Sequence, residues 1–359
     1  MARLIAFYLP QYHPTPENDE WWGKGFTEWT NVALSRPLFR GHEQPQIPGE
    51  LGFYDLRLDE SRIAQADLAK EYGIEGFIYW HYWLDENTRL LDLPYKRLME
   101  SKKPDFPFCL AWANHSWKGV FFGAKNRVLA EQKYNGDEDY TKHFYHVLEA
   151  FRDKRYMKVG DKPIFYIYSP KLMPDCKHFT ELWNKLAIKE GFLNGIHFIG
   201  EGIALKDKEK YGLNGVSYTN HRRIAAYNSV NCKNKYLQYF IWLLTKKRGL
   251  QVYEYKDAMK YFLNDKVTPE SVYPSIVPNW DTTPRLGRNA VILHNSTPEL
   301  FGQHVAEVLQ SVSHKDEENN IVFIKSWNEW AEGNYLEPSR KYGRAYLEEI
   351  KKQLNKVKK

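Results

Sequence analysis

The feature that most limits how this chain can fold is an alternation of short apolar runs with longer amphipathic segments. The apolar runs are continuous, as expected of strands that are buried on both faces. The amphipathic segments 59–72, 137–156 and 297–314 have the spacing of helices. The expected strands are residues 3–8, 76–80, 108–112, 164–168, 197–200, 215–218, 275–278 and 321–326. Strands that alternate with helices along one chain predict a parallel sheet.

Eight such units in 359 residues fit an α/β fold, a single (β/α)8 TIM barrel over residues 1–359 with long βα loops. A doubly wound open sheet is the structural alternative. Against it, the chain has no G-x-G-x-x-G motif, because residues 23–25 supply only two glycines in a polar segment. Nearly every expected strand also ends in polar or aromatic residues. A barrel gathers these ends on one face, where active sites lie.

The first long connection, residues 14–55, shows little helical or strand periodicity. It holds the aromatic segment 21–29 and then Pro37, Pro45 and Pro48. Connections of this length without regular structure are usually functional. We expect a lid or rim over the active-site face, with a folded structural flap as the alternative.

Composition points weakly to carbohydrate. The chain has 12 Trp, 25 Tyr and 19 Phe, and aromatic faces stack well on the apolar faces of sugar rings. A large aromatic core explains the same numbers equally well. The net charge of +6 is modest for this length and forms no basic stripe, so we expect no nucleic-acid partner.

Several other classes of protein are disfavoured. Cys109, Cys176 and Cys232 are far apart and form neither a metal-ligand cluster nor a disulfide framework. The close pair His143 and His146 is expected on a solvated helix without a third ligand, so we predict no metal and no cofactor. No G-x-S-x-G motif occurs, and no apolar run is long enough to span a membrane. We expect a cytoplasmic protein without a transmembrane segment, unless a signal segment precedes the sequence.

The chemistry is expected at Glu329 and Glu332, which follow the last apolar run. Cleavage of a glycosidic bond needs one carboxyl group to protonate the departing oxygen and a second group on the other side of the anomeric carbon. If the chain turns into a helix-like loop there, positions three apart share one face, and if it stays extended they diverge. Trp327 and Trp330 supply apolar walls that would raise one pKa, and Asn328 could bind a sugar hydroxyl. Helix-end or surface charges are the alternative.

Further substrate-binding residues are expected at the other strand ends. Tyr8 and Trp112 are alternatively core aromatics, and Glu201 and Asp281 are alternatively structural salt-bridge partners. Glu28, Trp29 and Glu337 are second-rank candidates. The expected binding residues are Tyr8, Tyr12, His13, His81, Tyr82, Trp112, Asn114, His115, Glu201, Trp280, Asp281, Trp327, Asn328 and Tyr335.

The motif WNEWAEGNYLEP at 327–338, followed by KYG at 341–343, resembles the WbsX-like family of bacterial O-antigen and capsule gene clusters. That family is similar to glycoside hydrolase family 99, the endo-α-mannosidases. The resemblance covers residues 7 to about 347. Its other motifs are FYLPQYHP at 7–14, GFTEWTN at 25–31, LGFYDLR at 51–57, GIEGF at 73–77, HYW at 81–83 and WDTTPR at 280–285.

The resemblance implies a (β/α)8 fold and a retaining reaction in which the 2-hydroxyl of the substrate attacks the anomeric carbon. It implies that Glu329 assists this hydroxyl as a base and that Glu332 is the general acid, which later activates water. The chain departs from many relatives at residues 114–119, NHSWKG, where they carry Glu-Asn-Trp-Thr-Arg after the first Asn. This departure bears on substrate preference and leaves the two glutamates unaffected.

Three functions remain open, each with an oligosaccharide or polysaccharide as partner. The preferred one is an enzyme that cleaves or transglycosylates an α-linked bond. The second is a glycosyltransferase of O-antigen or capsule biosynthesis, as the WbsX-like family is described. Against a nucleotide-sugar enzyme, the only Asp-x-Asp triplet, at 137–139, lies at an expected helix start, where it complements the helix dipole. The third is a catalytically silent glycan-binding module.

Overall fold

A closed barrel of eight parallel strands forms the centre of the molecule. The computed structural model describes residues 1–119, 127–225 and 250–357. The ring closes because β1 pairs with both β2 and β15 in parallel register. The barrel strands are β1 (Arg3–Tyr8), β2 (Gly76–Asp85), β4 (Phe108–Trp112), β8 (Lys162–Ile167), β9 (His197–Glu201), β10 (Gly215–Tyr218), β12 (Val272–Ile276) and β15 (Ile321–Ile324). The (β/α)8 barrel is therefore confirmed, and the open sheet is excluded.

The barrel interior is strongly aromatic. The ring of Phe7 in β1 stacks on Trp80 in β2, with centroids 4.7 Å apart, and meets Tyr166 in β8 edge-on at 5.2 Å. Every residue of β2, β4 and β15 is buried. These contacts explain the continuous apolar runs in the sequence. They also show that the core takes up a large share of the aromatic residues.

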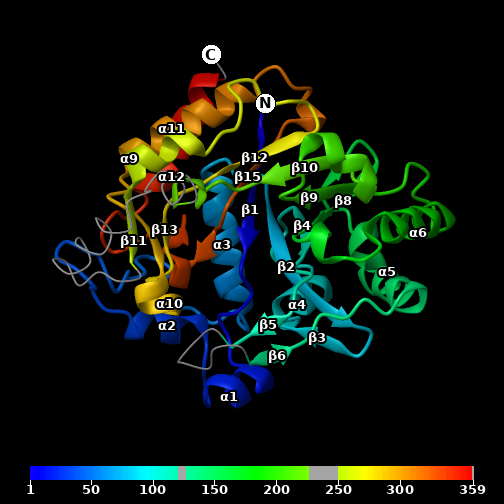
Figure 1. Cartoon of the computed structure of the whole chain (residues 1–359), viewed down its shortest axis with the longest axis horizontal. Coiled ribbons are helices and arrows are strands. Elements are labelled where there is room, and N and C mark those ends of the chain that lie inside the picture. Colours follow the sequence, from blue (N-terminus) through cyan, green and yellow to red (C-terminus); the bar gives the residue numbers. More distant parts are fainter. Residues whose placement is uncertain (120–126, 226–249, 358–359) are drawn as a thin grey trace, which may run out of the picture.

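Helices cover the outside of the barrel. They include α3 (Asp59–Glu71), α4 (Leu93–Ser101), α5 (Asp137–Arg152), α6 (Cys176–Lys189), α11 (Pro298–Ser311) and α12 (Ala345–Val357). Pairs α5–α6 and α11–α12 pack side by side, at opposite flanks of the view in Figure 1. The helix predicted for 137–156 ends earlier, because Asp153 turns extended and binds Arg155 through a buried ion pair. Helix α11 begins after Thr297, whose hydroxyl accepts the Leu300 N–H, as its Thr-Pro start suggests.

Two regions contain more regular structure than their sequence pattern predicts. Residues 14–55 include α1 (Pro16–Trp22) and α2 (Glu28–Leu34), so the expected lack of regular structure is wrong there. Thr15 and Thr27 cap these short helices through their hydroxyl groups. Beside the barrel lies a small sheet in the order β11 (Gln251–Glu254), β14 (Val291–His294) and β13 (Trp280–Asp281).

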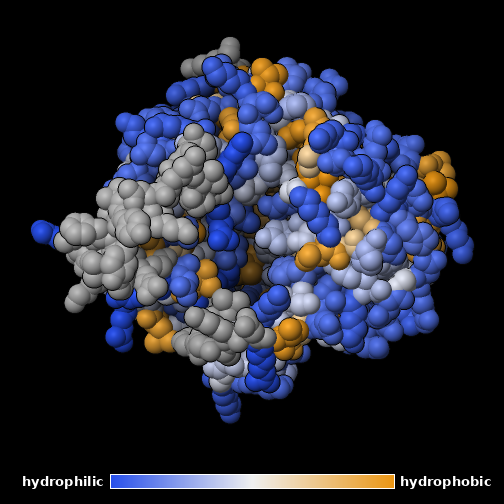
Figure 2. Space-filling view, viewed as in Figure 1, coloured by the Kyte–Doolittle hydropathy of each residue, from blue (hydrophilic) through white to orange (hydrophobic). Residues whose placement is uncertain are grey.

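The carboxyl ends of the strands face a group of loops and short elements. In Figure 1, β1 runs from the N-terminus at the top toward α1 and α2 at the bottom. The short elements α10 (Thr283–Leu286), β5 (Trp117–Lys118) and β6 (Val128–Ala130) also lie in this lower half. Figure 2 shows a hollow near the middle of the same face, with hydrophilic residues around most of it. The fold thus places its long loops where active sites of such barrels lie.

Within the described residues, no helix is long and apolar enough to cross a membrane. Cys109 and Cys176 are buried free thiols, and Cys232 lies outside the described residues.

Candidate active site

The two predicted glutamates lie in a tight hairpin that follows β15. It consists of β16 (Asn328–Glu329), the 3-10 turn η6 (Trp330–Glu332) and β17 (Asn334–Tyr335), with β16 antiparallel to β17. Gly333 allows the reversal, because its φ of +59° lies in the left-handed region. The chain therefore adopts the helix-like alternative, and Glu329 and Glu332 point to the same side.

Arg285, in α10, binds three carboxylates at once. Its Nη1 is 3.0 Å from Oε1 of Glu329 and 2.5 Å from Oε1 of Glu332. Its Nη2 is 3.1 Å from Oε2 of Glu28, at the start of α2. Arg285 was part of the family motif at 280–285, but no role was expected for it from the sequence. Glu28 was only a second-rank candidate. The arrangement brings together residues that lie more than 300 positions apart.

Burial raises the pKa of two of these carboxyl groups, Glu332 and Glu28. Burial and the neighbouring charge of Glu329 raise the pKa of Glu332 to about 7, although Arg285 and Lys325 act in the opposite direction. Burial also raises the pKa of Glu28, and the charge of Arg285 opposes that rise. A carboxyl group with a pKa near neutrality can exchange a proton with a substrate at neutral pH.

Lys325 provides a second buried cation beneath the carboxylates. Its Nζ lies about 5.9 Å from the centroids of Phe7, Trp80 and Trp280. Burial lowers its pKa, but the charge of Glu201 and the other nearby acids outweighs burial and keeps the pKa above its ordinary value. Lys325 therefore stays charged. Lys325 was not among the residues expected at the site, although a lysine directly after the apolar run 321–324 is itself a signal of a special role.

These charged groups border a cavity of about 800 Å³ at the carboxyl ends of the strands. Of the predicted binding residues, Tyr82, His115 and Trp280 line it, together with Glu329, Glu332 and the second-rank Glu28. Residues Trp22 and Phe26 of the connection 14–55 also line it. Lining residues that were not expected from the sequence include Gln11, Trp80, Trp117, Lys118, Tyr168, His221, Arg222, Arg285 and Lys325.

None of the other predicted binding residues lines this cavity. Trp112 is buried and donates its indole N–H to the carbonyl of Trp83 at 2.8 Å. The side-chain amide of Asn328 binds both the N–H and the carbonyl of Leu9, so it fixes the hairpin to β1. The residues found outside the cavity are Tyr8, Tyr12, His13, His81, Trp112, Asn114, Glu201, Trp327 and Asn328.

The physical reason is the alternation of side chains along a strand. In β2, Trp80 and Tyr82 line the cavity, whereas His81 between them points outward and contacts His143 of α5. A strand-end position in the sequence gives the height of a residue in the barrel but not the direction of its side chain. Tyr8 and Trp112 thus correspond to the alternative interpretation, core aromatics.

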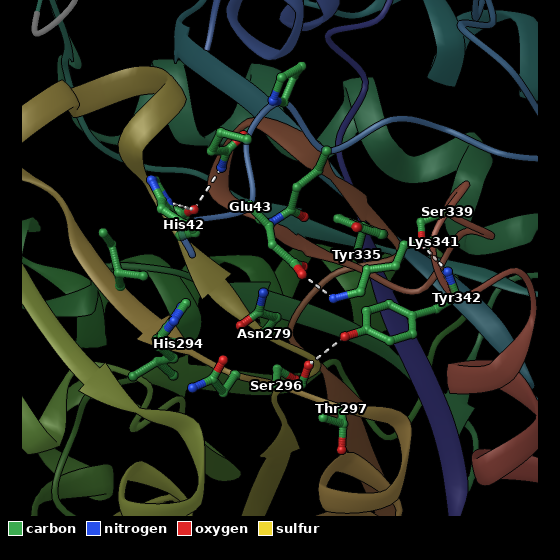
Figure 3. Close-up of a pocket in the computed structure, with 18 of the residues that line it drawn as sticks. His42, Glu43, Asn279, His294, Ser296, Thr297, Tyr335, Ser339, Lys341 and Tyr342 are labelled. Atoms are coloured by element: carbon green, nitrogen blue, oxygen red, sulfur yellow. Dashed lines mark hydrogen bonds and ion pairs between the residues drawn. The ribbon is translucent and has the colours of Figure 1, made fainter. Parts of the chain in front are cut away.

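Asp281 and Tyr335 line a second cavity of about 660 Å³. Its wall includes His42, Glu43 and Lys341, and Figure 3 shows Glu43 and Lys341 joined across it by an ion pair. Asp281 Oδ2 lies 2.8 Å from His42 Nε2, so Asp281 is a structural salt-bridge partner, the alternative interpretation. Tyr335 stacks on Trp330, with centroids 3.6 Å apart.

Glu337 and Trp29 support the hairpin from outside the cavity. Glu337 is buried and accepts hydrogen bonds from Trp330 Nε1 at 2.6 Å and from Gln65 Nε2 at 2.6 Å. Trp29 donates its indole N–H to the carbonyl of Tyr54.

The structure corrects the interpretation of the histidine pair on α5. His143 is fully buried rather than solvated, and its Nε2 lies 2.9 Å from Nε2 of His81. Two further groups with ligand atoms, His81 and Asp92, lie near His146. The spacing of histidines in the sequence therefore does not exclude a metal site here.

Solved structures with the same fold include glycoside hydrolases. A GH99 endo-α-mannosidase from Bacteroides thetaiotaomicron is 15% identical, with a TM-score of 0.57 over 99% of this chain and 97% of that one. A glycoside hydrolase-like protein is 14% identical, with a TM-score of 0.58 over 98% and 93% of the two chains. The protein thus shares the (β/α)8 barrel fold of these solved structures.

The family follows from sequence. The model of the family described as Glycosyltransferase WbsX matches residues 4–350. WxcX proteins from two strains of Xanthomonas campestris pv. campestris are 34% identical over an alignment of 360 positions, which covers 99% of this chain and 50% of each relative. This chain belongs to the WbsX family, as its motifs predicted. It spans about half the length of the curated relatives it matches.

Proposed function

We propose that this chain is a glycan-active enzyme that cleaves or transglycosylates an α-linked glycosidic bond of a bacterial polysaccharide. The observation that carries the proposal is that Glu329 and Glu332 both bind Nη1 of Arg285 and that the pKa of Glu332 is raised to about 7. A carboxyl group with a raised pKa beside a second carboxyl group in one cavity suits the acid and base roles of glycoside cleavage.

In the proposed first step, Glu329 takes the proton of the substrate 2-hydroxyl as that oxygen attacks the anomeric carbon. Glu332 gives its proton to the departing glycosidic oxygen, so a 1,2-anhydro sugar forms. In the second step, Glu332 takes a proton from water or from an acceptor hydroxyl, which opens the three-membered ring. The proton on Glu329 returns to the 2-oxygen. The 2-hydroxyl must lie trans to the leaving group, as in α-mannosides and α-rhamnosides.

The cavity wall supports a sugar as the occupant. Trp80, Tyr82, Tyr168 and Trp280 present aromatic rings, which pack against the C–H faces of sugar rings. Glu28 and the neighbouring aromatic residues of the connection 14–55 lie on the same wall, so this connection acts as a rim over the site. The structural neighbour from family GH99 is an endo-α-mannosidase, which agrees with this substrate class.

A glycosyltransferase is the second candidate, and the description of the WbsX family favours it. The same two glutamates would then transfer the glycosyl group to a sugar hydroxyl instead of water. A silent glycan-binding module is disfavoured, because a module that only binds does not need two adjacent carboxylates that are largely withdrawn from solvent.

The deciding experiment incubates the purified chain with α-mannosyl and α-rhamnosyl oligosaccharides, with and without nucleotide sugars, and identifies products by mass spectrometry. We expect shorter fragments without any donor, lost in Glu332→Gln and kept in Glu181→Gln, which changes an exposed glutamate of α6. Elongation that depends on a nucleotide sugar would establish the transferase instead. Binding without turnover in the unaltered chain would establish the binding module.

A further inference from the structure

A cluster of three histidines and one aspartate lies on the helix side of β2, away from both cavities. His81 belongs to β2, Asp92 precedes α4, and His143 and His146 lie one turn apart on α5. His81, Asp92 and His146 each offer one ligand atom, and these three atoms lie within 4.8 Å of one another. None of the four residues lines the cavity of the glutamates or the second cavity.

The site is buried but open on one side. His81 is 4% exposed, whereas the side chains of Asp92 and His146 are 28% and 23% exposed. His146 Nε2 is 3.9 Å from Asp92 Oδ1 and has no hydrogen-bond partner among the described residues. Buried ring nitrogens are nearly always hydrogen-bonded, so an unpartnered one that faces a carboxylate calls for an explanation.

Two neighbouring residues contact the proposed ligands: Arg89 contacts Asp92, and His143 contacts His81. Arg89 Nε lies 3.7 Å from Asp92 Oδ2, which leaves Oδ1 facing His146. The Nε2 atoms of His81 and His143 are 2.9 Å apart and share one proton. When His81 donates that proton, its Nδ1 carries a free lone pair. Partners of this kind orient histidine and carboxylate ligands in metal sites.

We propose that His81, Asp92 and His146 form a binding site for a divalent transition metal of the zinc class. Two imidazoles and one carboxylate suit Zn²⁺ better than Mg²⁺ or Ca²⁺, which prefer oxygen ligands. With metal–ligand bonds of about 2.1 Å, tetrahedral ligand atoms lie about 3.4 Å apart, so small side-chain rotations close the site. The ion ties β2 to α4 and α5 and takes no part in the reaction at the glutamates.

Burial favours the neutral form of these imidazoles, which is the form that binds metal ions. A neutral imidazole offers a lone pair to a cation. The positive charge of Arg89 opposes a second cation, and the carboxylate of Asp92 between them offsets that repulsion.

The test uses the whole chain after treatment with a chelator. Titration with ZnCl₂ in a calorimeter is expected to give one ion per chain and to raise the melting temperature by several degrees. His146→Gln is expected to lose both effects, while the matched variant His178→Gln, which changes an exposed histidine paired with Asp137, keeps them. Absence of stoichiometric binding by the unaltered chain, or equal binding by His146→Gln, would overturn the proposal.

Co²⁺ gives an independent readout. Cobalt in a tetrahedral site of this kind is expected to give intense visible absorption bands in the unaltered chain and in His178→Gln. These bands are expected to be absent in His146→Gln. Since neither readout depends on turnover, failure of the metal site is distinguishable from failure of the proposed glycan activity.

Discussion

At the scale of single residues, the site depends on the proton that Glu332 carries at neutral pH. The protonated form is the proposed acid, and the pKa is about 7, so the rate of bond cleavage should fall as the pH rises through about 7. The measurement is kcat/KM of the unaltered chain between pH 5 and 9. A profile that stays flat from pH 6 to 8.5 contradicts the role given to Glu332.

Lys325 should control that acidity. Its positive charge lowers the pKa of Glu332, so Lys325→Met is expected to move the basic limb of the pH profile upward by about one unit. The matched control is Lys315→Met, because Lys315 is also buried but binds the carbonyl of Val272 at the opposite end of the barrel. An equal shift in both variants would assign the effect to general destabilisation.

How far the sequence predicts the site differs from residue to residue. Glu329 and Glu332 could be predicted because they are polar residues directly after a buried strand, within a specific motif. The role of Arg285 could not be predicted, because it depends on three carboxylates that meet only when α2, α10 and the hairpin pack together. His81 shows the limit of the strand-end argument, since its neighbours Trp80 and Tyr82 face the cavity and it does not.

At the scale of the element, the hairpin around η6 depends on Gly333. An alanine Cβ there would lie 2.8 Å from Cβ of Asp281, in addition to the strain of a φ of +59°. Gly333→Ala should therefore lower the free energy of unfolding by about 1–3 kcal/mol more than the same substitution at a glycine that has a positive φ but no close contact. It should also reduce turnover, because η6 carries Glu332.

The control for this change is Gly343→Ala, where φ is +51° and no atom lies within 4 Å of the added Cβ. Its expected cost is about 1–2 kcal/mol, from the left-handed backbone alone. Urea unfolding of both variants gives the comparison. If the two lose the same stability, the contact with Asp281 does not constrain the hairpin.

The buried barrel strands and the long helices could be predicted, whereas the seven-residue helices α1 and α2 could not. The strand predicted at 3–8 and the start of the helix at Asp137 agree with the structure. The predicted strand at 275–278 lies at Val272–Ile276 instead, because the chain leaves the barrel before Trp280 joins β14. The capping threonines of α1 and α2 were signals in the sequence, but helices of seven residues give too little periodicity to read.

At the scale of the whole molecule, the barrel follows from the sequence because eight buried strands alternating with helices leave few closed arrangements. The hydrogen bonds that join distant segments at the ends of the barrel could not be predicted from the sequence. Glu337 is an example: its partners Gln65 and Tyr54 lie more than 270 positions away in the chain. This buried carboxyl group links the hairpin to α3 and to the connection 14–55, and it makes stability depend on pH.

Burial raises the pKa of Glu337 to about 7, although hydrogen bonds from Trp330, Gln65 and Tyr54 act in the opposite direction. The folded state thus holds a proton between pH 4.5 and 7 that the unfolded chain releases. Stability from this group is fully present below pH 4.5 and is lost as the pH rises through 7. A difference of this size corresponds to about 3 kcal/mol.

Glu337→Gln isolates this contribution, because glutamine keeps the shape of the side chain and cannot ionise. We compare the free energies of unfolding in urea at pH 5 and pH 8. The unaltered chain should lose up to about 3 kcal/mol relative to Glu337→Gln between these two values. Glu190→Gln, at an exposed ion pair with Arg152, serves as the control and should show no such relative change. A constant difference between the unaltered chain and Glu337→Gln across this range would mean that Glu337 is ionised in the folded state at pH 5 as well, and that its hydrogen bonds outweigh its burial.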